Sequence, residues 1–192
     1  RNFPMEVFYL RNGDIPQYLR DGVVDIAIIG ENVLVEKGED ISIAEKLGFS
    51  KCKVSLAVPK SFKFNSIKDF EGKRIATSYP NTVINYLKDK GVTADLHIIS
   101  GSVEIAPNIG LADAICDIVS SGSTLFKNNL KEVEVMLTSE AVLAVSPKIS
   151  EERKELLEKL QFRIQSVLRA RGSKYVLLNA PNDKLDGILK LL

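Results

Sequence analysis

The sequence is poor in the residues that act as nucleophiles, general bases or metal ligands. It has no tryptophan, one histidine, His97, and two cysteines, Cys52 and Cys116. His97 precedes an apolar pair at 98–99, so a histidine packed at the end of a strand is a better interpretation than a catalytic base. The cysteines are far apart and each lies in an apolar segment, which indicates two reduced, buried thiols rather than a disulfide or a metal site.

Long hydrophobic runs and an excess of either charge are also absent. No apolar stretch approaches the roughly 20 residues that span a bilayer. The 26 basic and 25 acidic side chains leave a net charge of +1. A general nucleic-acid binder would show a basic stripe, so any anionic ligand must be held by local geometry. We therefore expect no membrane and no nucleic acid as partners, and the two reduced thiols favour a cytoplasmic location.

Strand-like and helix-like segments alternate along the chain. Strands are predicted at 5–10, 23–30, 53–59, 74–80, 94–100, 113–119, 131–139 and 141–146, and helices or helical turns at 14–22, 31–38, 66–73, 81–91, 101–112 and 150–172. The alternation predicts an α/β fold with mainly parallel sheets. Ser150 is the expected cap of the last and longest helix, which is amphipathic.

Two stretches of the chain resemble each other. Each runs from a glycine through two residues to an aspartate, then through an apolar strand and a glycine-containing loop into a helix. Gly22 and Asp25 in the first stretch correspond to Gly110 and Asp113 in the second. Chance could produce this similarity, but it favours two lobes built from the same unit.

The strand at 113–119 is followed by five small, donor-rich residues: Ser120, Ser121, Gly122, Ser123 and Thr124. Ligands of open parallel sheets bind beyond the carboxyl ends of the strands. A loop that begins a helix there offers free N–H groups to a phosphate. Asp117 at the strand end could accept hydrogen bonds from sugar hydroxyls or face a magnesium ion. The pattern predicts a phosphorylated-sugar site with a metal; the alternative is an ordinary helix-capping turn.

The sequence resembles the ATP phosphoribosyltransferases, which begin histidine biosynthesis. The similarity is carried by the stretches at 14–34, 72–81, 100–125 and 130–137, and the stretch at 170–181 resembles the start of the regulatory domain of the long form. The resemblance implies transfer of the phosphoribosyl group of phosphoribosyl pyrophosphate to N1 of ATP, with Mg²⁺ carried by the substrate. Histidine is the implied feedback effector, and dimers or hexamers are the implied assemblies.

The resemblance also implies site residues. The loop from Asp117 to Thr124 would hold the 5-phosphate and the ribose, together with Asp113. Asp117 and Glu104 would stabilise the positive charge that develops on the ribose, and no side chain would act as a nucleophile. Further loops would line the cleft between the lobes through Gly30, Glu31, Asn32, Thr77, Ser78 and Tyr79.

The implied fold has two lobes, like the type II periplasmic binding proteins. We expect lobe I at 1–58 and 139–170, lobe II at 59–138, and the start of a small α+β regulatory domain at 171–192. The family's first strand, with its basic glycine-containing loop, is missing, so both ends are expected to be truncated. Two alternatives are a bilobal small-molecule-binding protein and a non-catalytic regulatory protein of the same fold.

Overall fold

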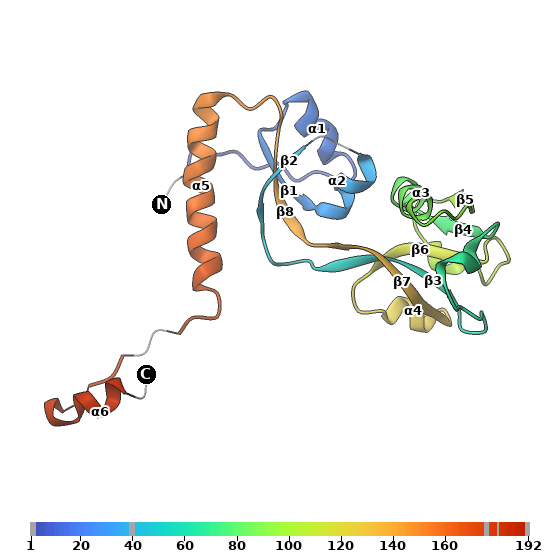
Figure 1. Cartoon of the computed structure of the whole chain (residues 1–192). Coiled ribbons are helices and arrows are strands. Elements are labelled where there is room, and N and C mark those ends of the chain that lie inside the picture. Colours follow the sequence, from blue (N-terminus) through green and yellow to red (C-terminus); the bar gives the residue numbers. More distant parts are fainter. Residues whose placement is uncertain (1–2, 39–40, 175–176, 180, 191–192) are drawn as a thin grey trace.

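The computed structural model describes residues 3–38, 41–174, 177–179 and 181–190. Within these ranges the strands form a three-stranded sheet in the order β1-β8-β2 and a five-stranded sheet in the order β5-β4-β6-β3-β7 (Figure 1). The elements are α1 (Ile15–Asp21), β1 (Ile26–Gly30), α2 (Glu31–Lys37), β2 (Ser42–Lys46), β3 (Cys52–Pro59), η1 (Ile67–Phe70), β4 (Arg74–Thr77), α3 (Pro80–Asp89), β5 (Asp95–Ile98), η2 (Val103–Ile105), β6 (Ala114–Val119), α4 (Ser123–Lys127), β7 (Leu130–Ser139), β8 (Ala141–Val145), α5 (Glu151–Ala170), η3 (Asn182–Lys184) and α6 (Leu185–Leu189).

The three-stranded sheet forms the core of the smaller lobe. Its central strand β8 pairs antiparallel with both β1 and β2. One face is covered by α1 and α2, whose Leu19 and Leu34 pack with Ile29 and Val142. Helix α1 ends where Gly22 adopts a φ of +74°, a left-handed conformation that glycine takes at little cost. This lobe therefore presents α2 and the end of β1 at one edge of its sheet.

The five-stranded sheet forms the larger lobe and buries side chains on both faces. Strand β4 runs parallel to β5 and β6, whereas β3 runs antiparallel to β6 and β7. On one face Leu56 and Ile75 pack against Val83 and Leu87 of α3. The other face is covered by η2 and α4, and its cluster of buried residues is Ala57, Ala76, Val103, Ala106, Ala112, Ile115, Val119, Leu125 and Leu130.

The chain passes between the lobes at two places, and Figure 1 shows β3 leaving the smaller lobe and β7 returning to it. Leu47 still packs in the smaller lobe, with Ala141 and Leu143. Strand β3 pairs in the five-stranded sheet from its first residue, Cys52, although the sequence analysis assigned residues 52–58 to lobe I. The return passage is at Glu140, between β7 and β8.

The sheets correct the expectation of mainly parallel pairing. The smaller sheet is antiparallel in both of its described pairs, and the larger sheet is mixed. The reason is the double passage between lobes, because a strand that leaves a lobe and a strand that returns to it run in opposite directions. Parallel pairing is described for β4 with β5 and for β4 with β6, and helix α3 connects β4 to β5.

Three local predictions differ from the structure. Residues 5–10 form no strand, and Tyr9 there is 96% exposed. The segment 101–112 contains only the 3-10 turn η2 before Pro107, which cannot continue a helical hydrogen-bond pattern. Strand β2 was not predicted. Of the expected start of a regulatory domain at 171–192, residues 175–176, 180 and 191–192 lie outside the described part.

The long helix was predicted closely. Ser150 caps α5 by accepting a hydrogen bond from the N–H of Arg153. Leu157 and Ile164 pack against the smaller lobe. Gln161 donates a hydrogen bond to the carbonyl oxygen of Ala44, 3.1 Å away. Helix α5 therefore lies along the face of the small sheet that α1 and α2 leave uncovered, and α6 follows it beyond both lobes (Figure 1).

Candidate functional site

Several strand ends meet where the two lobes join. The parallel strands β4, β5 and β6 end at the same edge of the larger sheet. Strand β3 begins at that edge and β7 ends there, since Cys52 is paired with Ser139. In the smaller lobe, the end of β1 lies beside the start of β8, where Gly30 is paired with Ala141. The loops that follow these strand ends therefore face one another across the junction.

Asp117 and Glu104 form a pair of carboxylates at this edge. Asp117 lies on the face of β6 that η2 covers, and η2 carries Glu104. Burial raises the pKa of Asp117, and the negative charge of Glu104 raises it further. The Ile118 N–H donates a hydrogen bond to the carboxylate at 2.8 Å, which lowers the pKa but does not outweigh burial. A half-buried carboxylate with a carboxylate neighbour is poised to stabilise a cation that arrives between them.

Two residues with left-handed backbone precede the turn η2 that carries Glu104. Gly101 has a φ of +86° and Ser102 a φ of +52°. The Ser78 hydroxyl donates to the carbonyl oxygen of Ile99 at 2.7 Å and so ties this loop to the loop after β4. Val103 is fully buried beside β6 and anchors the turn that bears Glu104.

The loop from Ser120 to Thr124 follows Asp117 directly. Gly122 is the N-cap residue of α4 with a φ of +72°, and the described structure shows no side-chain cap on that helix. The hydroxyl-bearing residues of the loop are exposed, and the Ser121 and Ser123 hydroxyls lie 3.0 Å apart. Because α4 has only five residues, its dipole is small. The loop can therefore bind an anion mainly through individual N–H and hydroxyl donors.

The residues Thr77, Ser78 and Tyr79 have different surroundings. Thr77 is fully buried, and its hydroxyl accepts a hydrogen bond from the Tyr79 N–H at 2.8 Å. The Ser78 hydroxyl holds the loop at Ile99. Tyr79 alone reaches the other lobe, where its hydroxyl accepts a hydrogen bond from Nδ2 of Asn32 at 3.1 Å. Burial raises the pKa of Tyr79 to about 12, so its hydroxyl is protonated at neutral pH.

The residues Gly30, Glu31 and Asn32 lie opposite, in the smaller lobe; they were expected in a loop, but Gly30 ends β1 and the other two begin α2 directly. The Asn32 N–H donates to Oγ of Ser139, and that hydroxyl donates back to Oδ1 of Asn32, each at 2.9 Å. A Cβ on Gly30 would collide with Oδ1 of Asn32, which explains glycine at this position. Glu31 pairs with Lys46 at 3.1 Å. Ser139, at the end of β7, is thus linked through Asn32 to Tyr79.

The fold does not place Asp113 beside the Ser120–Thr124 loop. This residue precedes β6, whereas the Ser120–Thr124 loop follows that strand, so about 20 Å of strand separate them. Arg74 forms two hydrogen bonds with the Asp113 carboxylate through its guanidinium and one through its backbone N–H. Arg74 lowers the pKa of Asp113. This pair secures the starts of β4 and β6.

Two groups of residues at the junction were missed by sequence reasoning. Ser55 is paired with Asp117 in the ladder, and its hydroxyl donates to Glu132 at 2.6 Å. Lys53 lies 3.3 Å from the same Glu132 and beside Val119, the residue before the serine loop. The second group is Glu36 with Thr82 and Asn81. Glu36 could have been noticed, because it lies one helical turn after Asn32.

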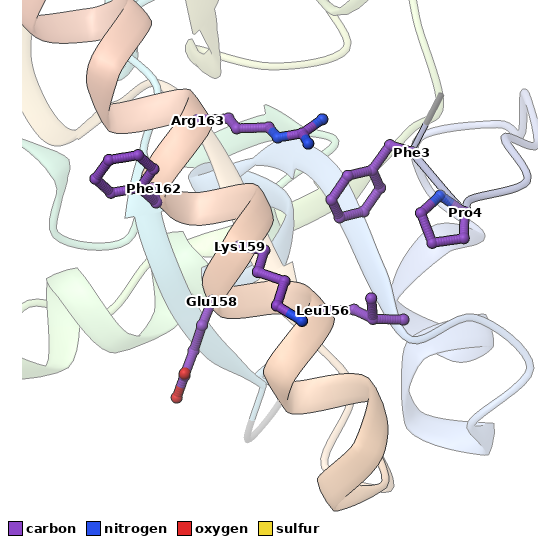
Figure 2. A pocket seen from close by; sticks show the side chains of 7 residues that line it. All are labelled: Phe3, Pro4, Leu156, Glu158, Lys159, Phe162 and Arg163. Carbon is purple, nitrogen blue, oxygen red and sulfur yellow. The ribbon is translucent and has the colours of Figure 1, made fainter. Parts of the chain in front are cut away.

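The cysteines have no role in this chemistry that the sequence predicted, and a pocket lies apart from the site. Cys116 is a buried free thiol whose pKa is raised by burial, as the sequence indicated, whereas Cys52 is a free thiol that is only partly buried. A pocket of about 460 Å³ is lined by Phe3, Pro4 and α5 (Figure 2). Figure 2 shows Phe3 and Pro4 opposite this helix, and the Arg163 guanidinium lies 5.0 Å from the Phe3 ring centre. This pocket is lined by none of the candidate site residues.

The described residues contain neither a metal-ligand cluster nor a membrane-spanning helix. In that part of the chain, no three His, Cys, Asp or Glu side chains are grouped so that they could hold a metal ion. The candidate site offers two such side chains, the carboxylates of Asp117 and Glu104. Nor does any helix in the described ranges have the length and apolar character needed to cross a membrane.

Comparison with known proteins identifies the family. The family model "HisG: ATP phosphoribosyltransferase" matches residues 11–166. The chain is 55% identical over 192 residues to an ATP phosphoribosyltransferase of Parabacteroides distasonis, and spans 68% of its length. It is 56% identical over 191 residues to the enzyme of the same name from Bacteroides thetaiotaomicron, again across 68% of that protein.

Solved structures agree. The ATP phosphoribosyl transferase (HisG:HisZ) complex from Thermotoga maritima matches with a TM-score of 0.75 and 32% identity, over 84% of this chain and 79% of that one. A substrate-binding protein of an amino acid ABC transporter matches with a TM-score of 0.61, over 86% of this chain and 74% of that one; at 17% identity it shows a shared fold alone. This chain belongs to the ATP phosphoribosyltransferase family, the enzymes of the first step of histidine biosynthesis.

Proposed function

We propose that the junction between the lobes is where this transferase joins its two substrates. The 5-phosphate of phosphoribosyl pyrophosphate would lie on the Ser120–Thr124 loop, with its ribose beside Asp117 and Glu104. ATP would lie beside the hydrogen bond that joins Asn32 of the smaller lobe to Tyr79 of the larger lobe, next to Gly30 and Glu31. The observation that carries this placement is the carboxylate pair directly beside a loop of exposed hydroxyls at the lobe junction.

The reaction demands little acid–base catalysis. The adenine N1 already has a lone pair, which forms the new bond to C1 of the ribose as the bond from C1 to pyrophosphate breaks. Positive charge develops on the ribose ring during this exchange. Asp117 and Glu104 stabilise that charge, and the loops hold the two reacting atoms in line.

The raised pKa of Asp117 suits this role. An ionised carboxylate that is half-buried beside another is less stable than one in water. A developing cation between the two carboxylates removes this cost, so their interaction with the ribose is stronger in the transition state than in the free enzyme. That difference, rather than tight binding, accelerates the reaction.

Mg²⁺ fits this site as an ion brought by the substrate. Magnesium usually keeps several waters and binds through one or two carboxylates together with substrate phosphates. Asp117 and Glu104 are the residues that would face it, and it would neutralise the departing pyrophosphate. Lys53, held near the loop by Glu132, supplies a positive side chain on the same face of the sheet.

The remaining features of the proposal follow from the family. We assign lobe I to about residues 1–51 and 140–170 and lobe II to about residues 52–139, which adjusts the sequence-based division to the sheet order. Residues 171–192 would begin a regulatory domain that binds histidine. A homo-oligomer, a dimer or a hexamer, and a cytoplasmic location, where both substrates are made, complete the proposal.

A crystal structure of the full-length enzyme with phosphoribosyl pyrophosphate, Mg²⁺ and ATP tests the placement. We expect phosphate oxygens within hydrogen-bond distance of the N–H or hydroxyl groups of Ser121–Thr124, and the ribose next to Asp117. Phosphate bound at the Arg74–Asp113 end of β6 instead would refute the proposal.

A further inference from the structure

The first turn of α3 has its backbone donors satisfied from the opposite lobe. Tyr79 is the N-cap residue, and its own side chain caps no N–H of the helix. Pro80 has no N–H, so Asn81 and Thr82 carry the free donors of this turn. Oε1 of Glu36 accepts the Asn81 N–H at 3.0 Å, and Oε2 accepts the Thr82 N–H at 2.9 Å.

Two further hydrogen bonds strengthen the contact. The Thr82 hydroxyl donates to Oε2 of Glu36 at 2.7 Å, and the Asn81 amide donates to the Glu36 carbonyl oxygen at 2.9 Å. Glu36 is only 9% exposed and Thr82 6%. The carboxylate also faces the positive end of the ten-residue α3. Hydrogen bonds to a buried charge are among the stronger ones in proteins.

Glu36 and Asn32 act from the same face of one helix. They are one turn apart on α2, and Leu34 of that helix points into the core of the smaller lobe. Asn32 binds the Tyr79 hydroxyl, while Glu36 binds the two residues after Pro80. The described apolar clusters belong to one lobe or the other. We call the contact of Asn32 and Glu36 on α2 with Tyr79, Asn81 and Thr82 the joint. The joint is polar, and water can replace its hydrogen bonds when the lobes separate.

We propose that Glu36 is a positioning residue for the transferase reaction. Its carboxylate accepts the first free N–H groups of α3 from across the junction and so keeps the two lobes joined in the free enzyme. It thereby holds Tyr79 against Asn32, at the place where ATP is proposed to bind. This inference rests on that placement of ATP. Phosphoribosyl pyrophosphate, which is proposed to bind within the larger lobe, depends less on the joint.

Glu36→Gln tests the inference in the full-length enzyme, because it keeps the shape but removes the charge and one acceptor. If the joined form falls to about one molecule in ten, the apparent dissociation constant for a ligand that needs it rises about tenfold. We expect the KM for ATP to rise about tenfold. The KM for phosphoribosyl pyrophosphate should change less than about threefold and kcat less than about twofold, because saturating ATP restores the joined form.

Two comparisons separate this effect from a general loss of stability. Glu158→Gln, the same substitution on an exposed position of α5, should leave all three constants unchanged. Thr82→Val should raise the KM for ATP and Thr82→Ser should restore it, since only the hydroxyl is required. The Thr82 pair keeps the test informative even if Glu36→Gln folds poorly.

Amide-resolved hydrogen exchange gives a readout that does not depend on where substrates bind. In the wild-type enzyme without substrates, the Asn81 and Thr82 amides should be protected, and Glu36→Gln should accelerate both. Unprotected amides in the wild type, or a fall in kcat at unchanged KM, would overturn the inference. Protection with an equal rise in both KM values would support the joint and refute only the placement of ATP.

Discussion

Asp117→Asn is the sharpest test of the proposed chemistry, because it removes one charge and little else. The asparagine keeps an oxygen that can accept the Ile118 N–H, as the carboxylate does at 2.8 Å. Two unit charges about 4 Å apart interact by about 4 kcal/mol at an effective dielectric of about 20. Partial solvent access and the partial charge on the ribose reduce this to about 2–3 kcal/mol. We therefore expect kcat to fall about 30- to 150-fold, with little change in the KM for phosphoribosyl pyrophosphate.

The same substitution has an independent signature in stability. Because the folded-state pKa of Asp117 is raised, its contribution to stability is present at low pH and is lost as the pH rises through that pKa. Asp117→Asn should therefore be at least as stable as the wild type at neutral pH, and the difference should vanish in acid. A merely structural role would leave kcat unchanged, because asparagine caps a helix or turn about as well as aspartate does.

Steady-state kinetics of the full-length enzyme, with calorimetry of the same samples, measure both effects. In the wild type, kcat should fall as the pH drops through the raised pKa of Asp117, and this acidic limb should be absent in the variant. A kcat within about threefold of the wild type would refute the electrostatic role. So would a loss of thermal stability at neutral pH.

The remaining predictions concern residues with contrasting roles. Thr124→Val should raise the KM for phosphoribosyl pyrophosphate about ten- to hundredfold with kcat retained, because a hydrogen bond to a charged group contributes about 1.5–3 kcal/mol; an unchanged KM would exclude Thr124 from the phosphate site. Asp113→Asn should leave the kinetic constants unchanged and lower the free energy of unfolding by about 1 kcal/mol at neutral pH, as titrated by urea. That difference should disappear as acid protonates Asp113 through its lowered pKa, and altered kinetics would contradict a purely structural role. Tyr79→Phe should raise the KM for ATP severalfold by removing the bond to Asn32, yet leave the pH profile unchanged up to about pH 10, because the Tyr79 hydroxyl titrates at about 12; a lost alkaline limb would mean that the tyrosinate matters.

Much of the fold could be predicted from local pattern. The strand at β6, the loop after it and the long helix α5 with its Ser150 cap were predicted from apolar runs, small residues and helical spacing. Such signals depend on neighbours in the chain, which one sequence displays. The direction of strand pairing was predicted wrongly, because it depends on which strands cross between the lobes.

Sequence reasoning placed some candidate site residues better than others, because it depends on neighbours in the chain. Asp117 and the Ser120–Thr124 loop are adjacent in sequence, so their proximity in space was never in question. Asp113 is also near them in sequence, but an extended strand carries it to the opposite edge of the sheet. Residues that are close in sequence lie far apart in space when an extended strand runs between them.

The family, the alternation of strands and helices, and the hydroxyl and carboxylate groups around the end of β6 follow from the order of residues in the chain. The burial of Thr77, the contact of Tyr79 with Asn32 and the capping of α3 by Glu36 from the opposite lobe depend on how the two lobes pack. The joint brings together residues 45 and 46 positions apart in the chain. No periodicity encodes such a contact, because the free N–H groups of a helix can accept a partner from any part of the molecule that the fold places there.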